Sequence, residues 1–202
     1  MTVSIWQRAD GPSAHVDVAI VGGGICGVSA ALEAERLGCS VLLIERGSVA
    51  SGASGRNAGY LMRGMAESYS AAIERFGRER ARAIWVLSEE NLVALRELGA
   101  ARVEGFADQP SCLLALEEQE ADELEESHRL LLEDGFASEL LEPPLEVDAV
   151  WKSGRPRVGL VNPADAVCHP VQLCRELASR LRADVIRAGC EVAKIEDRGD
   201  AV

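Results

Sequence analysis

The chain has 202 residues, of which 48% are hydrophobic and 27% charged, a composition typical of a globular protein with a sizeable core. Its net charge of −12 at pH 7 argues against nucleic acid or an anionic membrane surface as a partner, because both attract basic surfaces. Its six cysteines include no C-x-x-C pair and only three histidines accompany them, so neither a metal site nor a disulfide framework is indicated, and we expect buried thiols.

The beginning of the chain carries no targeting or membrane-spanning signal. Residues 1–14 lack the apolar core of a secretory signal, and the longest apolar stretch, residues 18–32, is interrupted by glycines and too short to span a bilayer. We therefore predict a cytoplasmic protein without a membrane span.

The first recognisable unit is a strand, a helix and a second strand. Val16–Val21 is a short apolar run that predicts a buried strand, and helical spacing of apolar residues follows over Ile25–Leu37. Gly38 stands where a helix C-terminus favours a residue with positive φ. Val41–Ile44 predicts a second buried strand, so the opening is a βαβ unit with parallel strands.

The remaining chain alternates helices with short strands. The pattern predicts a small polar loop at 47–64, then one or two helices over 67–98 with a break at Gly77 and a stop at Gly99. A strand at 112–116, an acidic helix at 117–133 and a turn or linker at 142–146 are expected next. The last part of the chain is expected to form a strand within 151–161, a helix from Pro170 to Leu181, and strands at 185–187 and 192–195. No internal repeat is present.

A glycine pattern lies between the first strand and the first helix. Gly22, Gly24 and Gly27 form G-x-G-x-x-G: the first glycine allows a sharp turn, the second lets the backbone approach a pyrophosphate, and the third lets the helix pack closely on the strand. The amides of Ile25 and Cys26 would then donate to phosphate oxygens at the positive end of the helix. The pattern stands in the strand-to-helix context that supports a dinucleotide-binding turn.

An acidic residue ends the second strand. Glu45 follows Gly22 by 23 residues, where a carboxylate can accept hydrogen bonds from both ribose hydroxyls of an adenosine and would repel a 2′-phosphate. FAD and NAD fit these features equally well, and NADP is disfavoured.

The loop "SGASGRNAGYL" from Ser51 to Leu61 directly follows this strand. With "DVAIVGGGICG", "VLLIERG", "GLVNPADAVCHPVQLCRELASRL" and "RAGCEVAKIE", it makes the chain resemble the D-amino-acid oxidase superfamily of FAD-dependent amine oxidoreductases, which includes glycine oxidase, sarcosine oxidase and γ-glutamylputrescine oxidoreductase. The resemblance covers about residues 15–202 and does not specify a substrate. It implies FAD as the cofactor.

The resemblance also implies a cofactor role for individual residues. Glu45 would bind the ribose with Arg46 beside the adenine, and Val192 would hold the adenine through its backbone. The loop would contribute Ala53 and Ser54 along the phosphates and Ala58, Gly59 and Tyr60 along the isoalloxazine. Arg56 and Asn57 of the same loop are included, with an ordinary surface turn as their alternative. The loop has no histidine of the kind that bonds covalently to flavin in one branch of the superfamily, so noncovalent FAD is implied.

We therefore predict an α/β protein: a Rossmann-type FAD-binding domain (residues 14–99 and 159–202) interrupted by part of a mixed-sheet substrate domain (residues 100–158), with the pattern of the superfamily truncated at the C-terminus. The implied function is oxidation of the C–N bond of an amino acid or amine by hydride transfer to flavin N5, with a small-molecule amine or amino acid as substrate. The alternatives are a noncatalytic or incomplete FAD-binding fragment, for which the short chain speaks, and an NAD-dependent Rossmann enzyme. The catalytic residues, the substrate and the oligomeric state stay open.

Overall fold

The computed structural model describes residues 15–142, 151, 155–197 and 199. It divides into two compact units. Unit 1 contains the described residues up to Arg56 and those from Cys174 onward, and unit 2 is Asn57–Leu173. The predicted divisions after residues 99 and 158 differ from these units, because the helices that follow the loop pack on one another within unit 2. The assignment of a cofactor domain and a substrate domain stays a prediction.

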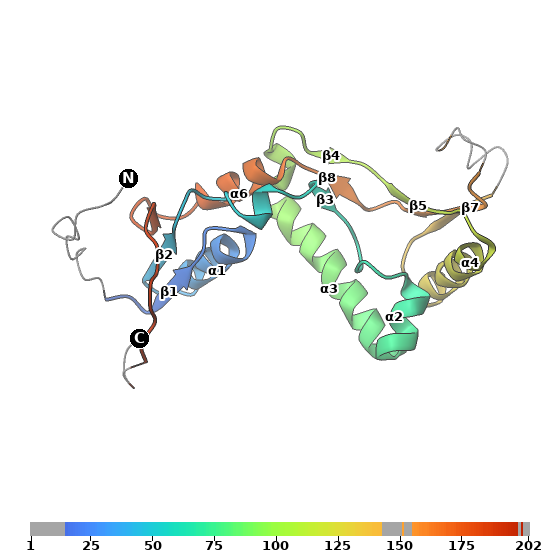
Figure 1. Cartoon of the computed structure of the whole chain (residues 1–202), viewed down its shortest axis with the longest axis horizontal. Coiled ribbons are helices and arrows are strands. Elements are labelled where there is room, and N and C mark those ends of the chain that lie inside the picture. The colour runs from blue at the N-terminus through green and yellow to red at the C-terminus, as the bar shows by residue number, and fades with distance from the viewer. Residues whose placement is uncertain (1–14, 143–150, 152–154, 198, 200–202) are drawn as a thin grey trace. The chain divides into compact units, whose positions relative to one another are not determined.

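Unit 1 contains the predicted βαβ unit (Figure 1). Its elements are β1 (Val18–Val21), α1 (Ile25–Arg36), β2 (Val41–Glu45), the short 3₁₀ helix η2 (Ala53–Gly55) and β9 (Ile186–Ala188). The three strands pair in parallel in the order β1-β2-β9, with Val18 opposite Val41 and Leu43 opposite Ile186. The predicted parallel pair and the first of the two late strands are confirmed.

Helix α1 ends as its sequence predicts. Gly38 adopts φ +83°, and the amide of Cys39 donates to the carbonyl of Ala34 at 3.0 Å, which closes the last turn. The helix contacts both β1 and β2, and its Val28 is fully buried, as is Leu43 of β2. Full burial of such a side chain contributes about 1.5–3 kcal/mol to stability, so this packing fixes the helix N-terminus over the sheet.

Two expectations for unit 1 are wrong. β1 is half exposed, with Val21 at 58% exposure, because its burial alternates along the strand and the described part of the chain covers the face of Ala19 and Val21 less than the opposite face. No strand forms at residues 192–195, because Gly189 takes a left-handed φ of +72° and ends β9, and Ile195 is 65% exposed.

Unit 2 combines three long or medium helices with two small antiparallel sheets (Figure 1). Its helices are α2 (Tyr69–Phe76), α3 (Arg78–Glu97), η3 (Ala100–Arg102) and α4 (Glu118–Glu133), and α6 (Pro170–Ala178) begins in it. One sheet has the order β5 (Ser111–Ala115), β7 (Val158–Asn162), β6 (Glu139–Leu141), and the other β3 (Tyr60–Leu61), β8 (Ala166–Val167), β4 (Ala107–Asp108). The predicted break at Gly77 and stop at Gly99 are confirmed, with φ +82° and +95°.

The core of unit 2 is built around three aromatic rings. Tyr69 packs against Trp85 at 4.7 Å between ring centroids and meets Phe136 edge to face at 5.8 Å. The predicted acidic helix is α4, which buries Leu124 and Leu131 while its glutamates face outward. This aromatic and aliphatic cluster sets the distance between the helices and the β5-β7-β6 sheet.

Several sequence predictions fall outside the described residues: the arm at 1–14, most of the linker at 142–146 and the last two residues. Of the helices that the structure describes, none combines the length and apolarity needed to cross a bilayer. Cys168 and Cys174 are buried as expected, whereas Cys26 and Cys190 are exposed, so the prediction of buried thiols is wrong for those two.

Candidate functional site

The turn between β1 and α1 has the geometry that its three spaced glycines predict. Gly22 has φ +106°, which disfavours any residue with a Cβ. A Cβ on Gly27 would lie 1.9 Å from the carbonyl oxygen of Gly22, so α1 packs directly on the turn. A Cβ on Gly24 would lie 2.9 Å from Ser54 Oγ. The turn therefore keeps its backbone uncovered at the N-terminus of α1.

Glu45 closes the other side of this turn. Its Oε2 accepts a hydrogen bond of 2.7 Å from the amide of Gly23, and its Oε1 accepts one of 2.7 Å from the amide of Gly47. These two bonds hold the pKa of the Glu45 carboxyl below its ordinary value, so it is charged at neutral pH. The carboxylate, which also accepts a hydrogen bond from the Ser51 side chain, retains capacity for a further donor, such as a ribose hydroxyl.

Ser54 meets the first turn of α1 from the loop. The amide of Ile25 donates to Ser54 Oγ at 3.0 Å, and the N-cap residue Gly24 has no side chain to cap the helix. Because the first four amides of a helix have no partner inside it, this end is a ready site for an anion. Among the neighbouring predicted residues, Ala53 is exposed in η2 and Cys26 is exposed on α1.

The turn therefore fits a dinucleotide on its own geometry. It combines a backbone without Cβ atoms at Gly22 and Gly24, a helix N-terminus at which the amide of Ile25 donates to the Ser54 hydroxyl oxygen, and a charged carboxylate at the end of β2. FAD and NAD share the adenosine and the pyrophosphate that these groups would hold, so this geometry alone does not separate the two.

The predicted adenine side is less defined. Arg46 is exposed directly after β2, and Val192 is half buried beyond the end of β9. The amides of Gly189 and Cys190 donate to the carbonyls of Gly47 at 2.9 Å and Glu45 at 3.0 Å, which hold this segment beside the end of β2. The roles of Arg46 and Val192 stay predictions.

The loop predicted to contact the flavin ring divides between the units. Arg56 is exposed in unit 1, and Asn57–Tyr60 lie in unit 2. Asn57 Oδ1 accepts from the amide of Gly59 at 2.8 Å. Gly59 has φ +78° and a Cβ there would lie 2.0 Å from the carbonyl of Cys168, so only glycine fits. Ala58 and Tyr60 are exposed, Tyr60 to 67%.

Sequence reasoning missed two residues that shape the turn. Gly23 donates to Glu45, and a Cβ there would lie 3.2 Å from Glu45 Cβ; its position in the glycine run was the available signal. Ala50 adopts φ 63° and its amide donates to the carbonyl of Gly23 at 2.9 Å. Nothing in the sequence marks Ala50, because alanine seldom takes a left-handed conformation.

A second polar cluster, in unit 2, was also missed. The buried Arg63 follows β3; its amide donates to Asp165 Oδ1 at 2.9 Å, and its guanidinium bonds to Asn162 and Glu89. Asp165 is 1% exposed and also accepts from the Ser111 hydroxyl at 2.5 Å. The signal available was an arginine directly after an apolar strand. In the described ranges, no group of three His, Cys, Asp or Glu side chains could hold a metal ion.

Comparison with known proteins identifies the family. Residues 17–202 match the model of the family described as "DAO: FAD dependent oxidoreductase". The chain belongs to this family. The cofactor of this family is FAD and the members of the family are oxidoreductases, which confirms the predicted cofactor and enzyme class.

Two curated relatives match parts of the chain. The probable oxidoreductase OrdL of Haemophilus influenzae is 34% identical over 124 residues, which are 57% of this chain and 28% of that protein. The γ-glutamylputrescine oxidoreductase of Escherichia coli is 33% identical over 81 residues, which are 40% of this chain and 19% of that protein. The matched regions are thus a minor part of both relatives.

Solved structures confirm the predicted α/β fold. Glycine oxidase from Bacillus cereus superposes with a TM-score of 0.66 and 25% identity, over 92% of this chain and 49% of that one. The L-amino acid deaminase of Proteus myxofaciens gives a TM-score of 0.72 at 20% identity, over 93% of this chain and 41% of that one, and its likeness is one of fold alone. The chain spans about half the length of these solved proteins or less.

Proposed function

We propose that the protein is an FAD-dependent oxidoreductase that oxidises the C–N bond of an amino acid or amine. The observation that carries the proposal is the turn of Gly22–Gly27 with Glu45 beside it, in a chain that belongs to an FAD-dependent family. The names of relatives support the substrate class: γ-glutamylputrescine oxidoreductase acts on an amine and glycine oxidase on an amino acid.

In this proposal, the residues of the turn hold the adenosine half of the cofactor. The backbone at Gly22 and Gly24 and the amides of Ile25 and Cys26 bind the pyrophosphate. Glu45 accepts from the ribose hydroxyls while retaining its bond from the Gly23 amide, because each carboxylate oxygen can accept two donors. Ser54 Oγ gives up its bond from Ile25 to a phosphate oxygen, or shares that amide with it.

The rest of the loop would serve the flavin ring. The fixed backbone at Gly59 orients Ala58 and Tyr60, whose exposed side chains are free to lie along a ring system. When bound, FAD accepts a hydride at N5 from the carbon next to the substrate nitrogen. The absence of histidine from this loop supports noncovalent attachment.

The test is anaerobic reduction of the flavin. The purified chain is loaded with FAD and mixed with D-amino acids, glycine, sarcosine and polyamine derivatives, and the loss of oxidised-flavin absorbance is followed. Gly24→Val is the control that should not bind flavin. A Cβ at residue 24 would already lie 2.9 Å from Ser54 Oγ, so the valine side chain crowds the turn. Reduction by a compound of this panel supports the proposal. Full FAD binding with no reduction by any compound of the panel contradicts it.

A second candidate is an FAD-binding chain that lacks activity by itself. In doubly wound sheets the nucleotide crevice lies beside strand 1, between it and the next strand in the order 3-2-1-4-5. The order β9-β2-β1 supplies strands 3, 2 and 1, and no described residue pairs with the other edge of β1. FAD binding with no reduction by any compound favours this candidate.

A further inference from the structure

The short strand β3 carries the exposed Tyr60, and it is fixed at both of its ends. At the first end, the Cys168 amide donates to the carbonyl of Gly59 at 2.9 Å, and no Cβ fits at Gly59. At the other end, the amide of Arg63 donates to Oδ1 of the buried Asp165 at 2.9 Å. A strand of two residues is shorter than most strands and has few ladder hydrogen bonds, so these end contacts determine where Tyr60 lies.

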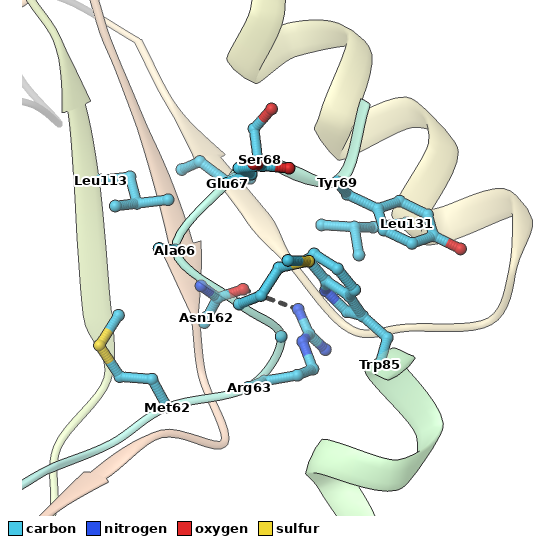
Figure 2. A pocket seen from close by; sticks show the side chains of 13 residues that line it. Met62, Arg63, Ala66, Glu67, Ser68, Tyr69, Trp85, Leu113, Leu131 and Asn162 are labelled. Carbon is cyan, nitrogen blue, oxygen red and sulfur yellow. Dashed lines mark hydrogen bonds between the residues drawn. The ribbon is translucent and has the colours of Figure 1, made fainter. Parts of the chain in front are cut away.

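Asp165 belongs to a closed set of hydrogen bonds. Its Oδ2 accepts from the Ser111 hydroxyl at 2.5 Å, and Ser111 Oγ accepts from the Asn162 side-chain amide at 3.5 Å, the longest contact of the set. Asn162 Oδ1 accepts from Arg63 Nη2 at 2.7 Å, the bond that Figure 2 draws. Because the Ser111 hydroxyl donates its one proton to Asp165 and accepts from Asn162, donors and acceptors match around the set. We call these four residues the Asp165 network.

The Asp165 network joins segments that lie far apart in the sequence. Arg63 follows β3 and Ser111 begins β5, whereas Asn162 ends β7 and Asp165 immediately precedes β8. The guanidinium of Arg63 is buried and its charge is paired with Glu89 at 2.9 Å. Hydrogen bonds of charged groups are stronger than those between neutral groups, and in the interior no water replaces a broken one. The network therefore ties β3 firmly to the β5-β7-β6 sheet.

The members of this network are placed to act through β3 and not by direct contact with a cofactor. Arg63, Asn162 and Asp165 are buried, and none of the four residues belongs to the predicted cofactor-binding set. The exposed group at the end of this chain of contacts is Tyr60, two residues after Ala58 in the loop. A change at Asp165 would reach the surface as a displacement of β3.

We propose that Asp165 is a positioning residue for the flavin. Through the amide of Arg63 it holds β3 in place, and the residues that lie along the isoalloxazine are then Ala58, Gly59 and Tyr60. This role rests on the proposed function, which assigns those three residues to the isoalloxazine. The adenosine half of FAD binds at the glycine turn of unit 1, which contains no residue of the Asp165 network. Loss of the network should therefore change the surroundings of the flavin ring more than the affinity for FAD.

Visible circular dichroism of bound FAD tests this role, because an isoalloxazine held in a fixed chiral environment gives stronger bands than a mobile one. Wild type is compared with Asp165→Ala, which removes the acceptor of the Arg63 amide, and with Asp165→Asn, which keeps an acceptor oxygen there. We expect Asp165→Ala to lose about half or more of the band intensity per bound FAD, while its dissociation constant for FAD rises by less than about tenfold. Asp165→Asn should keep the wild-type bands.

Two further variants separate positioning from a general loss of stability. Ser127→Ala removes a fully buried hydroxyl that bonds to Ser70 and joins α2 to α4, so it should destabilise unit 2 and yet keep the bands. Ser111→Ala opens the Asp165 network while leaving the Arg63 amide its acceptor, and should lose a smaller part of the bands than Asp165→Ala. It keeps the role testable even if Asp165→Ala does not fold.

Hydrogen exchange in the flavin-free chain gives a readout that needs no cofactor. The Cys168 amide donates to Gly59, at the end of β3 opposite to Arg63. It should exchange with solvent faster in Asp165→Ala and in Ser111→Ala than in Ser127→Ala, because only the first two variants release β3.

The outcomes distinguish this role from the proposed function. Wild-type bands in both Asp165→Ala and Ser111→Ala, at full FAD occupancy, would overturn the role of Asp165 and leave the proposed function intact. Equal losses in Asp165→Ala and Asp165→Asn, or in Asp165→Ala and Ser127→Ala, would also overturn it, because the position of the acceptor oxygen would then not be the cause. Failure of wild type to bind FAD would overturn the proposed function and the role of Asp165 together.

Discussion

Replacing Gly27 by alanine should separate α1 from the turn that precedes it. A Cβ on Gly27 would lie 1.9 Å from the carbonyl oxygen of Gly22, where contacts below 3.0 Å are essentially never seen, so the helix or the turn must move by about 1.1 Å. Neither neighbour is a flexible side chain that could turn away. The strain therefore falls on the backbone that carries the predicted phosphate amides.

The cost can be estimated from two opposing effects. Overpacking costs about 1–3 kcal/mol, and a backbone clash belongs at the upper end. Alanine recovers about 1 kcal/mol over glycine inside a helix. The net loss of about 2 kcal/mol predicts a fall in melting temperature of about 4–8 °C. Displaced amides that lose one bond to a phosphate weaken FAD binding by at least about tenfold.

The assay pairs thermal unfolding with an FAD titration of wild type and Gly27→Ala. Gly52→Ala is the matched control for stability, because Gly52 has an ordinary φ of −89° and no atom within 4 Å of a Cβ built on it. Its melting temperature should stay within about 1 °C of wild type. A Gly27→Ala protein with wild-type melting temperature and FAD affinity would refute the close packing of α1 on the turn.

Three further predictions concern other residues. The pKa of the Glu45 carboxyl is lowered from 4.5 in the folded chain, so the stability that the charged carboxylate contributes is complete above about pH 5 and is lost as the pH falls through the lower folded pKa. The difference in melting temperature between wild type and Glu45→Gln should therefore shrink on acidification to about pH 3. A constant difference would contradict the hydrogen bonds that Gly23 and Gly47 donate to Glu45. Asp165→Ala leaves the amide of Arg63 and the hydroxyl of Ser111 without their buried acceptor, and should lower the free energy of unfolding by about 2–5 kcal/mol in chemical denaturation. An unchanged denaturation midpoint would show that the cluster is not buried. Gly59→Ala should lower FAD affinity and increase proteolysis of the loop, because its Cβ would lie 2.0 Å from the carbonyl oxygen of Cys168. A variant with the FAD affinity and the proteolysis rate of wild type would show that the loop has another conformation.

The sequence predicted those parts of the fold that depend on local chemistry. Gly38, Gly77 and Gly99 end helices with positive φ, a conformation that glycine adopts without the steric cost of a Cβ. The parallel pair β1-β2 follows from two apolar runs joined by an amphipathic helix. The glycine turn and Glu45 were visible for the same reason, since their spacing is set by one short βαβ unit.

The parts that the sequence did not predict depend on contacts between distant segments. The apolar residues of β1 do not reveal that the strand forms a sheet edge, and those at 192–195 do not reveal that Gly189 has already ended the pairing. Arg63 and Asp165 are separated by 102 residues, so no local pattern could indicate that they meet in the interior. The predicted domain divisions stay predictions, and they differ from the unit boundaries because α2 packs on both α3 and α4, a tertiary choice that helix periodicity leaves open.

We propose that this chain binds FAD noncovalently through its glycine turn. The most direct measurement is acid precipitation of the purified chain after saturation with FAD and gel filtration, followed by absorbance and mass analysis of the supernatant, with Gly24→Val processed alongside. We expect stoichiometric FAD in the supernatant of wild type and none in that of Gly24→Val. Flavin colour that stays in the wild-type pellet, or equal FAD recovered from both proteins, would contradict it.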